Sequence, residues 1–212
     1  MYYRFILGGS ENLGLDFGVF LGMLSIQCNG LIIILCSYYI FMFKNIANFS
    51  NTSDYLPLLN GVLITDLFVI FLLNTQILKS SVLRTWYDKY NLSAVIADVL
   101  IIMIALIITR AIYSYVFNTF SLLRFVFLAV IVQVIHDSLF YIFFKSIPRG
   151  VNQMLDTFKD YANEVSYKAI LADSGMMILA CLISSYLANQ TLNTNSIVLI
   201  VSVYLLPYLL YN

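Results

Sequence analysis

Long runs of apolar residues, separated by short polar stretches, occupy most of this chain and limit the folds it can adopt. A helix that crosses the roughly 30 Å hydrocarbon core of a bilayer needs about 20 mostly apolar residues. Six stretches meet or approach this length: residues 17–43, 56–78, 93–117, 120–144, 169–189 and 192–211. The last is the weakest candidate, because its apolar part begins only at Ile197 and contains Pro207.

The composition agrees with a membrane location. Of the 212 residues, 61% are hydrophobic and 10% are charged, whereas soluble domains average about 45–50% apolar and about 25% charged residues. Eleven basic and eleven acidic residues cancel, so there is no basic field to attract nucleic acid. We therefore predict an all-α, polytopic transmembrane helix bundle that forms a single domain, residues 1–212, within the lipid bilayer.

One connection is long enough to hold a helix of its own, at residues 150–168. Its apolar residues recur at helical spacing and its polar residues occupy the other side, as in an amphipathic helix. Such a helix lies on the membrane surface or docks a protein partner. A homo-oligomer is a separate expectation. The candidate contact residues are Met154, Phe158, Lys159 and Lys168.

The distribution of basic residues predicts the orientation, since cytoplasmic loops are enriched in Lys and Arg. One side of the membrane collects Arg4, Lys79, Arg84, Lys89, Lys145, Arg149, Lys159 and Lys168. The N-terminus is therefore expected in the cytoplasm, together with the C-terminus if the last segment crosses. Trp86, Tyr87 and Tyr90 are expected to anchor this face at the lipid–water interface.

Ionisable residues inside predicted spans cost at least about 2.5–3.5 kcal/mol each on insertion scales, so each needs a reason. They are Asp66, Asp98, Arg110, Arg124, His136, Asp137 and Asp173. Counted along their helices, Asp98, Asp137 and Asp173 lie about 8, 11 and 6 Å from the cytoplasmic end. Asp66 falls near mid-membrane. Both arginines are expected to extend to the lipid headgroups, because no acidic residue is placed at the depth of Arg110.

Two interpretations of the acidic residues remain open. Asp98, His136, Asp137 and Asp173, with Gln133 and Asp66, have the chemistry of a proton relay, a cation path or a hard-metal site. Alternatively, these groups hydrogen-bond neighbouring helices and fix their packing. Small residues recur beside them, as at helix–helix interfaces: Ala94, Ala105, Thr109, Ala129, Ala180, Ser184 and Ala188.

Motifs of common enzyme classes are missing from the sequence. There is no GxSxG, no HExxH, no P-loop and no glycine-rich nucleotide turn. His136 is the single histidine, which excludes metal sites built on a histidine pair. We therefore predict no catalytic residues and no cofactor, we leave a metal unassigned, and the balance favours a protein that is not an enzyme.

Three segments carry a resemblance to a known group of proteins. They are Ile135-His136-Asp137-Ser138-Leu139-Phe140-Tyr141, the run from Phe144 to Gly150 (FKSIPRG), and the run from Met154 to Ala162 (MLDTFKDYA). In these the chain resembles uncharacterised multi-pass membrane proteins encoded by nucleocytoplasmic large DNA viruses. The resemblance implies a location in a host internal membrane or in the inner membrane of a virion, and no catalytic residues.

The leading functional hypothesis from the sequence is a non-enzymatic multi-pass membrane protein, a structural or assembly component of a viral or host internal membrane. The alternative is a proton- or cation-conducting transporter or channel that uses the intramembrane Asp/His cluster. A metal-dependent intramembrane lipid enzyme is a third hypothesis.

Overall fold

Every regular element in the described part of the chain is helical. The computed structural model describes residues 43–165 and 167–211. Its elements are a short 3-10 helix η1 (Thr52–Asp54) and the α-helices α2 (Tyr55–Asn74), α3 (Ser81–Tyr90), α4 (Leu92–Val116), α5 (Leu122–Ser146), α6 (Gln153–Val165), α7 (Tyr167–Leu187) and α8 (Leu192–Leu210). The predicted all-α fold is confirmed.

Five of these helices are long and apolar enough to cross a membrane: α2, preceded by η1, and α4, α5, α7 and α8. They lie where the sequence places spans, with ends that differ by a few residues from the expected ranges. The chain is therefore an integral membrane protein of the helical class. The predicted first span, residues 17–43, lies outside the described residues apart from its last residue.

The ends of the helices follow from local sequence. Thr191 begins α8 by accepting a hydrogen bond from the Thr194 N–H at 3.1 Å, and Ser80 does the same for α3 with the Leu83 N–H at 3.2 Å. Pro57 stands in the first turn of α2, where its missing N–H costs no hydrogen bond. Pro207 lies in the last turn of α8, and the helix continues through it to Leu210.

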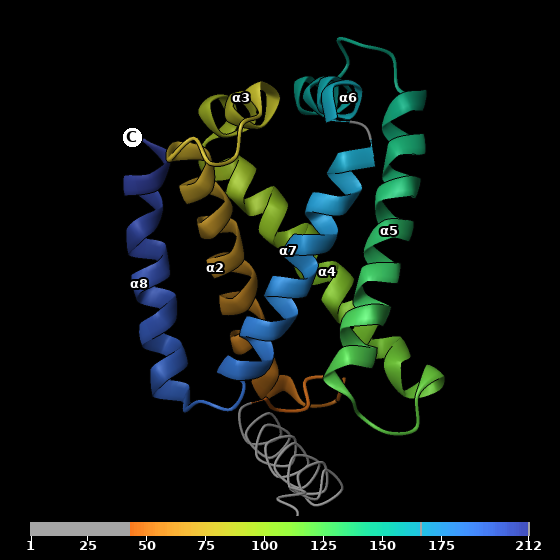
Figure 1. Cartoon of the computed structure of the whole chain (residues 1–212), viewed down its shortest axis with the longest axis vertical. Coiled ribbons are helices and arrows are strands. Elements are labelled where there is room, and N and C mark those ends of the chain that lie inside the picture. Colours follow the sequence, from red (N-terminus) through yellow and green to blue (C-terminus); the bar gives the residue numbers. More distant parts are fainter. Residues whose placement is uncertain (1–42, 166, 212) are drawn as a thin grey trace, which may run out of the picture. The chain divides into compact units, whose positions relative to one another are not determined.

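Four long helices form a closed ring, and α8 stands outside it. Helix α2 packs against α4 and α7, and α5 packs against the same two helices from the other side. Helix α8 packs against α2 (Figure 1). Small residues allow the closest approach within the ring. A Cβ atom added to Gly61 of α2 would lie 2.2 Å from Ser184 Oγ and 2.7 Å from the Ser184 backbone nitrogen of α7.

Two amphipathic helices, α3 and α6, lie across one end of the ring (Figure 1). We call this the capped end; it is where α2 and α5 finish and α4 and α7 begin. At the opposite end, which we call the loop end, residues 43–51 lead into η1 and α2. The sequence analysis predicts α6 but not α3, a helix of ten residues that lies between two much longer spans.

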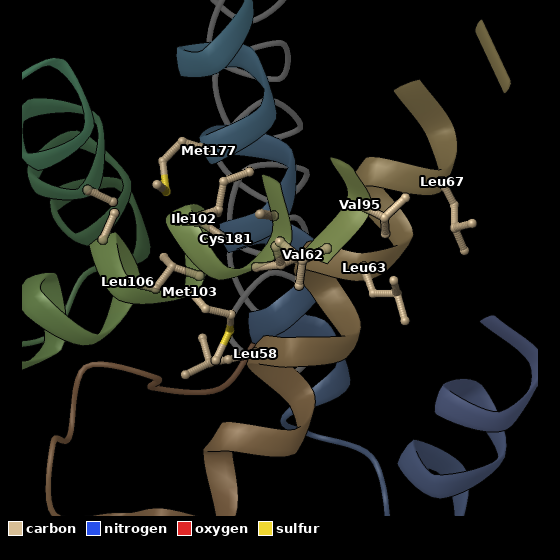
Figure 2. Close-up of a cluster of buried hydrophobic side chains, with 14 of the residues drawn as sticks. Leu58, Val62, Leu63, Leu67, Val95, Ile102, Met103, Leu106, Met177 and Cys181 are labelled. Atoms are coloured by element: carbon tan, nitrogen blue, oxygen red, sulfur yellow. The ribbon is translucent and has the colours of Figure 1, made fainter. Parts of the chain in front are cut away.

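Two apolar layers fill the ring between its ends. Figure 2 shows Leu58 and Val62 of α2, Ile102 and Leu106 of α4, and Met177 and Cys181 of α7 in one cluster. All six side chains are buried, as are Phe125 and Ala129 of α5. Every fourth residue of a helix returns to the same face, so these residues form part of a row along the inward face of each ring helix. We call each row an inward stripe; its middle is apolar and its two ends are polar.

Candidate functional site

Each ring helix carries one aspartate at the capped end of its inward stripe. Each stripe consists of every fourth residue along one helix, because these residues lie on the same helical face. The four stripes are Asp54-Leu58-Val62-Asp66 at the start of and along α2, Asp98-Ile102-Leu106-Arg110 on α4, Phe125-Ala129-Gln133-Asp137 on α5 and Asp173-Met177-Cys181-Ser185 on α7. We call Asp66, Asp98, Asp137 and Asp173 the acid layer. The two apolar layers separate it from the polar residues at the loop end.

The hydroxyl of Tyr87 lies between two of these carboxyl groups. It donates a hydrogen bond to Asp66 Oδ1 at 2.8 Å and lies 3.0 Å from Asp98 Oδ2. Trp86, the preceding residue on α3, donates from Nε1 to the same Asp98 oxygen at 3.0 Å. Asp66, the twelfth of the twenty residues of α2, is therefore linked to Asp98 through one phenol; its depth near mid-membrane stays a prediction.

The single hydroxyl proton of Tyr87 limits how it can hydrogen-bond to the two carboxyl groups. A phenol has one hydroxyl proton to donate, so Tyr87 satisfies one carboxylate at a time. The contact with the second carboxyl group becomes a hydrogen bond when that carboxyl carries a proton and donates it to the phenol oxygen. Asp66 is fully buried and its Oδ2 has no hydrogen-bond partner within the described residues. The geometry thus accommodates one proton shared between Asp66 and Asp98.

Tyr87 itself keeps its proton. Burial raises the pKa of Tyr87 well above its usual value, and the negative charges of Asp98 and Asp66 raise this pKa further. Because ionisation would place a third negative charge beside two carboxyl groups in a low-dielectric site, the phenol acts as a hydrogen-bond donor at physiological pH.

Asp137 of α5 has a separate set of partners. Its Oδ1 accepts a hydrogen bond from Gln133 Nε2 at 2.7 Å and lies 3.2 Å from His136 Nδ1. Its Oδ2 and the Gln133 Oε1 are buried and have no partner among the residues described. An unpaired buried acceptor costs about 1–3 kcal/mol, so this pair is poised to accept protons or hydrogen bonds that the described conformation does not supply.

Asp173 of α7 completes the layer. Its carboxyl group is close enough to Asp137 and Asp98 for their charges to interact. Tyr161 of α6 lies near the same three carboxyl groups. Burial raises the pKa of Tyr161, and the charges of Asp173, Asp98, Glu164 and Asp137 add to that rise. The structure therefore brings the predicted residues of α4, α5 and α7 into one electrostatic group at the capped end.

Aromatic side chains of α3 and α6 cover the acid layer. The rings of Trp86 and Phe158 lie 4.7 Å apart, and Phe158 meets Phe140 of α5 edge-on at 5.2 Å. The Tyr90 hydroxyl lies 3.0 Å from Thr157 Oγ1 of α6. Trp86 and Tyr87 are almost fully buried. They are therefore not the exposed interface anchors that the sequence suggests, because their polar atoms serve the acid layer.

The predicted contact residues of the amphipathic helix mostly face the protein. Met154 and Phe158 pack against the core of the bundle. Lys159 donates to the Ile147 carbonyl at 2.5 Å and lies 3.5 Å from Asp156 Oδ1. Of the four residues, only Lys168 is exposed. The apolar side of α6 thus contacts α3 and α5 of the same chain, and docking of a partner on α6 stays a prediction.

At the loop end, Arg110 is buried and paired and does not extend to the headgroups. Its guanidinium lies 3.7 Å from Asp54 Oδ2, and both side chains are inaccessible to solvent. It also donates to the Asn48 and Asn51 carbonyls and lies over the Tyr55 ring at 4.7 Å. Lys44 forms a second ion pair with Asp54 at 2.9 Å. The acidic partner sits just before α2, so counting along the spans alone does not reveal it.

Among residues 43–165 and 167–211, no three His, Cys, Asp or Glu side chains are close enough together to hold a metal ion. Two of the four carboxyl groups, those of Asp66 and Asp98, are instead linked by a neutral donor, the Tyr87 hydroxyl.

Sequence reasoning missed the residues that organise the site, Trp86 and Tyr87. A signal for them exists in the alternation of apolar and polar residues from Ser81 to Tyr90, which places both aromatic residues on one helical face. Without the position of α3, nothing in the sequence shows that this face is directed at Asp66 and Asp98.

Comparison of the chain with known protein families, with curated proteins and with solved structures finds no match.

Proposed function

We propose that this protein transports protons across the membrane and that the acid layer is its proton-binding site. The observation that carries the proposal is the Tyr87 hydroxyl, which lies 2.8 Å from Asp66 and 3.0 Å from Asp98 in the interior of the ring. Ionisable groups inside membrane spans mark proton and ion pathways in many transporters. Two carboxyl groups on one phenol bind and release a proton with little movement of heavy atoms.

The remaining acidic residues extend this site toward α5 and α7. Asp137 has one unpartnered buried oxygen within the described part of the chain, and Asp173 interacts with the charges of Asp137 and Asp98. Each carboxyl group is thus influenced by the protonation of another. A proton taken up by one of them favours the release of a proton by its neighbour, which is the coupling that a relay needs.

The apolar layers favour a transporter over an open channel. Buried apolar side chains lie between the acid layer and the Arg110–Asp54 pair; among them are Leu58, Val62, Ile102 and Leu106 (Figure 2). A proton at the acid layer has no polar side chain on these stripes to carry it to the loop end. Transport therefore requires a second conformation in which the apolar layers part, as in alternating access.

The proposed orientation places the capped end in the cytoplasm. Seven basic residues lie near that end: Lys79, Arg84, Lys89, Lys145, Arg149, Lys159 and Lys168. Only three of the described basic residues lie toward the loop end: Lys44, Arg110 and Arg124. This distribution agrees with the enrichment of Lys and Arg in cytoplasmic loops.

Proton flux into liposomes tests this function. The purified full-length chain is reconstituted with a pH-sensitive dye inside the vesicles, and a pH gradient is imposed. We expect wild-type protein to dissipate the gradient, and Asp98→Asn to slow this by at least about tenfold, as expected when one essential proton carrier is lost. The control Asp88→Asn removes an exposed carboxylate of α3 at the same end of the bundle and should leave the rate unchanged.

Equal rates in empty vesicles, wild type and Asp98→Asn would contradict proton transport. A flux that follows a Na⁺ gradient and not a pH gradient would assign a metal cation as the cargo instead.

A second candidate function, a structural or assembly component of a membrane, rests on a different observation. The hydrogen bonds of Trp86 and Tyr87 to Asp66 and Asp98 tie α3 to α2 and α4. Polar contacts of this kind fix helix packing in membranes. If the protein has this structural role, we expect Asp98→Asn to lower its thermal stability, and we expect neither the wild type nor the variant to transport protons. The resemblance to viral membrane proteins extends this second proposal to an internal membrane of an infected host or a virion.

A further inference from the structure

A basic groove lies at the capped end, where α5 ends and α6 packs beside it. It is lined by Tyr141, Phe144, Lys145, Ile147, Pro148, Arg149, Lys159 and Asn163. The turn after α5 creates it, because Ile147 is extended and Gly150 adopts a positive φ of 89°, so that the chain returns toward α6. Three cationic side chains therefore share one groove with aromatic and aliphatic ones.

The cations of the groove are not fully neutralised by the chain itself. The Lys145 ammonium lies over the Tyr141 ring at 5.5 Å and has no carboxylate partner among the described residues. Arg149 pairs with Asp160 at 2.8 Å, but the two side chains are 55% and 54% exposed. An exposed ion pair contributes little stability, so the Arg149 guanidinium is free to turn toward a stronger anion.

The groove opens beside the surface that faces lipid. Helix α5 is a membrane span, and Leu139, Ile142 and Phe143 near its end are 62%, 64% and 54% exposed. Apolar side chains so exposed on a span belong in contact with acyl chains. Lys145 lies on the same helix within the next turn, at the level where headgroups begin.

We propose that this groove binds the phosphate headgroup of an anionic phospholipid in the leaflet at the capped end. Lys145 and Arg149 bind the phosphate oxygens, and Lys159 adds positive charge at the base of the groove. The acyl chains lie along Leu139, Ile142 and Phe143. Basic pockets beside membrane spans bind anionic headgroups in this way, whereas the quaternary ammonium of a choline lipid would be repelled by the three cations.

Native mass spectrometry of the detergent-purified full chain tests the site. The protein is mixed with phosphatidylglycerol or with phosphatidylcholine of the same acyl chains, and the lipid retained is measured. We expect wild type to retain phosphatidylglycerol preferentially. The double variant Lys145→Gln/Arg149→Gln should lose at least about tenfold in apparent affinity, because it removes both charge-assisted contacts to the phosphate.

A matched variant separates the groove from general charge. Lys89→Gln/Lys168→Gln removes two exposed cations at the same end of the bundle, outside the groove, and should bind phosphatidylglycerol as wild type does. The exchange Lys145→Arg/Arg149→Lys should keep most of the affinity. Equal losses in the two glutamine variants, no preference of wild type between the lipids, or displacement of the lipid by inorganic phosphate at equal concentration would overturn the proposal.

Discussion

Tyr87 shows how one side chain makes buried acids acceptable in hydrocarbon. Isolated carboxylates are expensive in a low-dielectric medium, yet Asp66 is fully buried. A neutral phenol that donates to one carboxyl and can accept from the other satisfies the pair with a single shared proton. Under the proposed function, this arrangement lets the pair hold a proton without a metal ion or a basic partner.

Replacing Tyr87 with Phe tests this role through stability. The variant leaves Asp66 Oδ1 without its donor, and leaving a buried acceptor unsatisfied costs about 1–3 kcal/mol. We expect a lower thermal midpoint in detergent. The control Tyr115→Phe removes a hydroxyl from a side chain that is 89% exposed, so the change there should stay within about 0.5 kcal/mol. A Tyr87→Phe protein as stable as wild type would show that the hydroxyl is not needed.

The packing of α2 on α7 depends on the absence of a side chain at one position. A Cβ atom on Gly61 would lie 2.7 Å from the backbone nitrogen of Ser184 and 3.0 Å from the Ala180 carbonyl oxygen. Both are main-chain atoms of a helix, so they cannot turn away as a side chain can. The two helices must therefore move apart to accept any larger residue.

Comparing two glycine substitutions, one at this contact and one in open space, tests the close approach of α2 and α7. Gly61→Ala should destabilise the protein by about 1–3 kcal/mol through overpacking. Gly175→Ala places its Cβ in open space on α7 and should be neutral or stabilising by about 0.5–1 kcal/mol, the usual effect of Gly to Ala within a helix. Thermal unfolding of both variants in the same detergent gives the comparison. Similar changes in the two midpoints would contradict the close approach.

The start of α6 responds to acid through Asp156. Its Oδ2 accepts a hydrogen bond from the Gly150 N–H at 2.8 Å, and that bond, followed by the positive charge of Lys159, holds the pKa of Asp156 below its usual value. A carboxyl whose pKa falls on folding stabilises the folded state above its unfolded pKa. This contribution is lost as the pH drops below about 4.

The single tryptophan reports this change, because Trp86 contacts Phe158 of α6. We expect an acid-induced change in its fluorescence in wild type, and we expect Asp156→Asn to show part of that change already at neutral pH. Asp160→Asn, which leaves the Gly150 bond intact, should behave as wild type does. The same acid transition in all three proteins would show that Asp156 does not hold the first turn of α6.

Over the whole molecule, the sequence predicts the spans well and the site only in part. A membrane span is recognised by its length and hydrophobicity, and both properties can be read directly from residues 55–74 and 92–116. Helical periodicity also predicts that Asp98, Ile102, Leu106 and Arg110 lie on one face of their helix. It does not predict that Asp98 contacts Tyr87 or that Arg110 pairs with Asp54. Tyr87 and Asp54 lie on neighbouring segments, and tertiary packing determines where those segments lie.

The proposed orientation is tested by labelling single cysteines with a membrane-impermeant maleimide. In a background with Cys28, Cys36 and Cys181 replaced by Ser, we expect Lys89→Cys at the capped end to react only from the cytoplasmic side. Asn193→Cys, near the start of α8 at the loop end, should react only from the opposite side. The reverse pattern would place the acid layer at the other face of the membrane.

The shared proton is the central physical claim, and infrared difference spectroscopy measures it directly. At neutral pH we expect the wild-type protein to show a protonated-carboxyl C=O absorption that is weaker in the double variant Asp66→Asn/Asp98→Asn, which retains Asp137 and Asp173, and unchanged in Asp88→Asn. Identical absorption in wild type and the double variant would mean that no proton resides between Asp66 and Asp98, and would contradict the account.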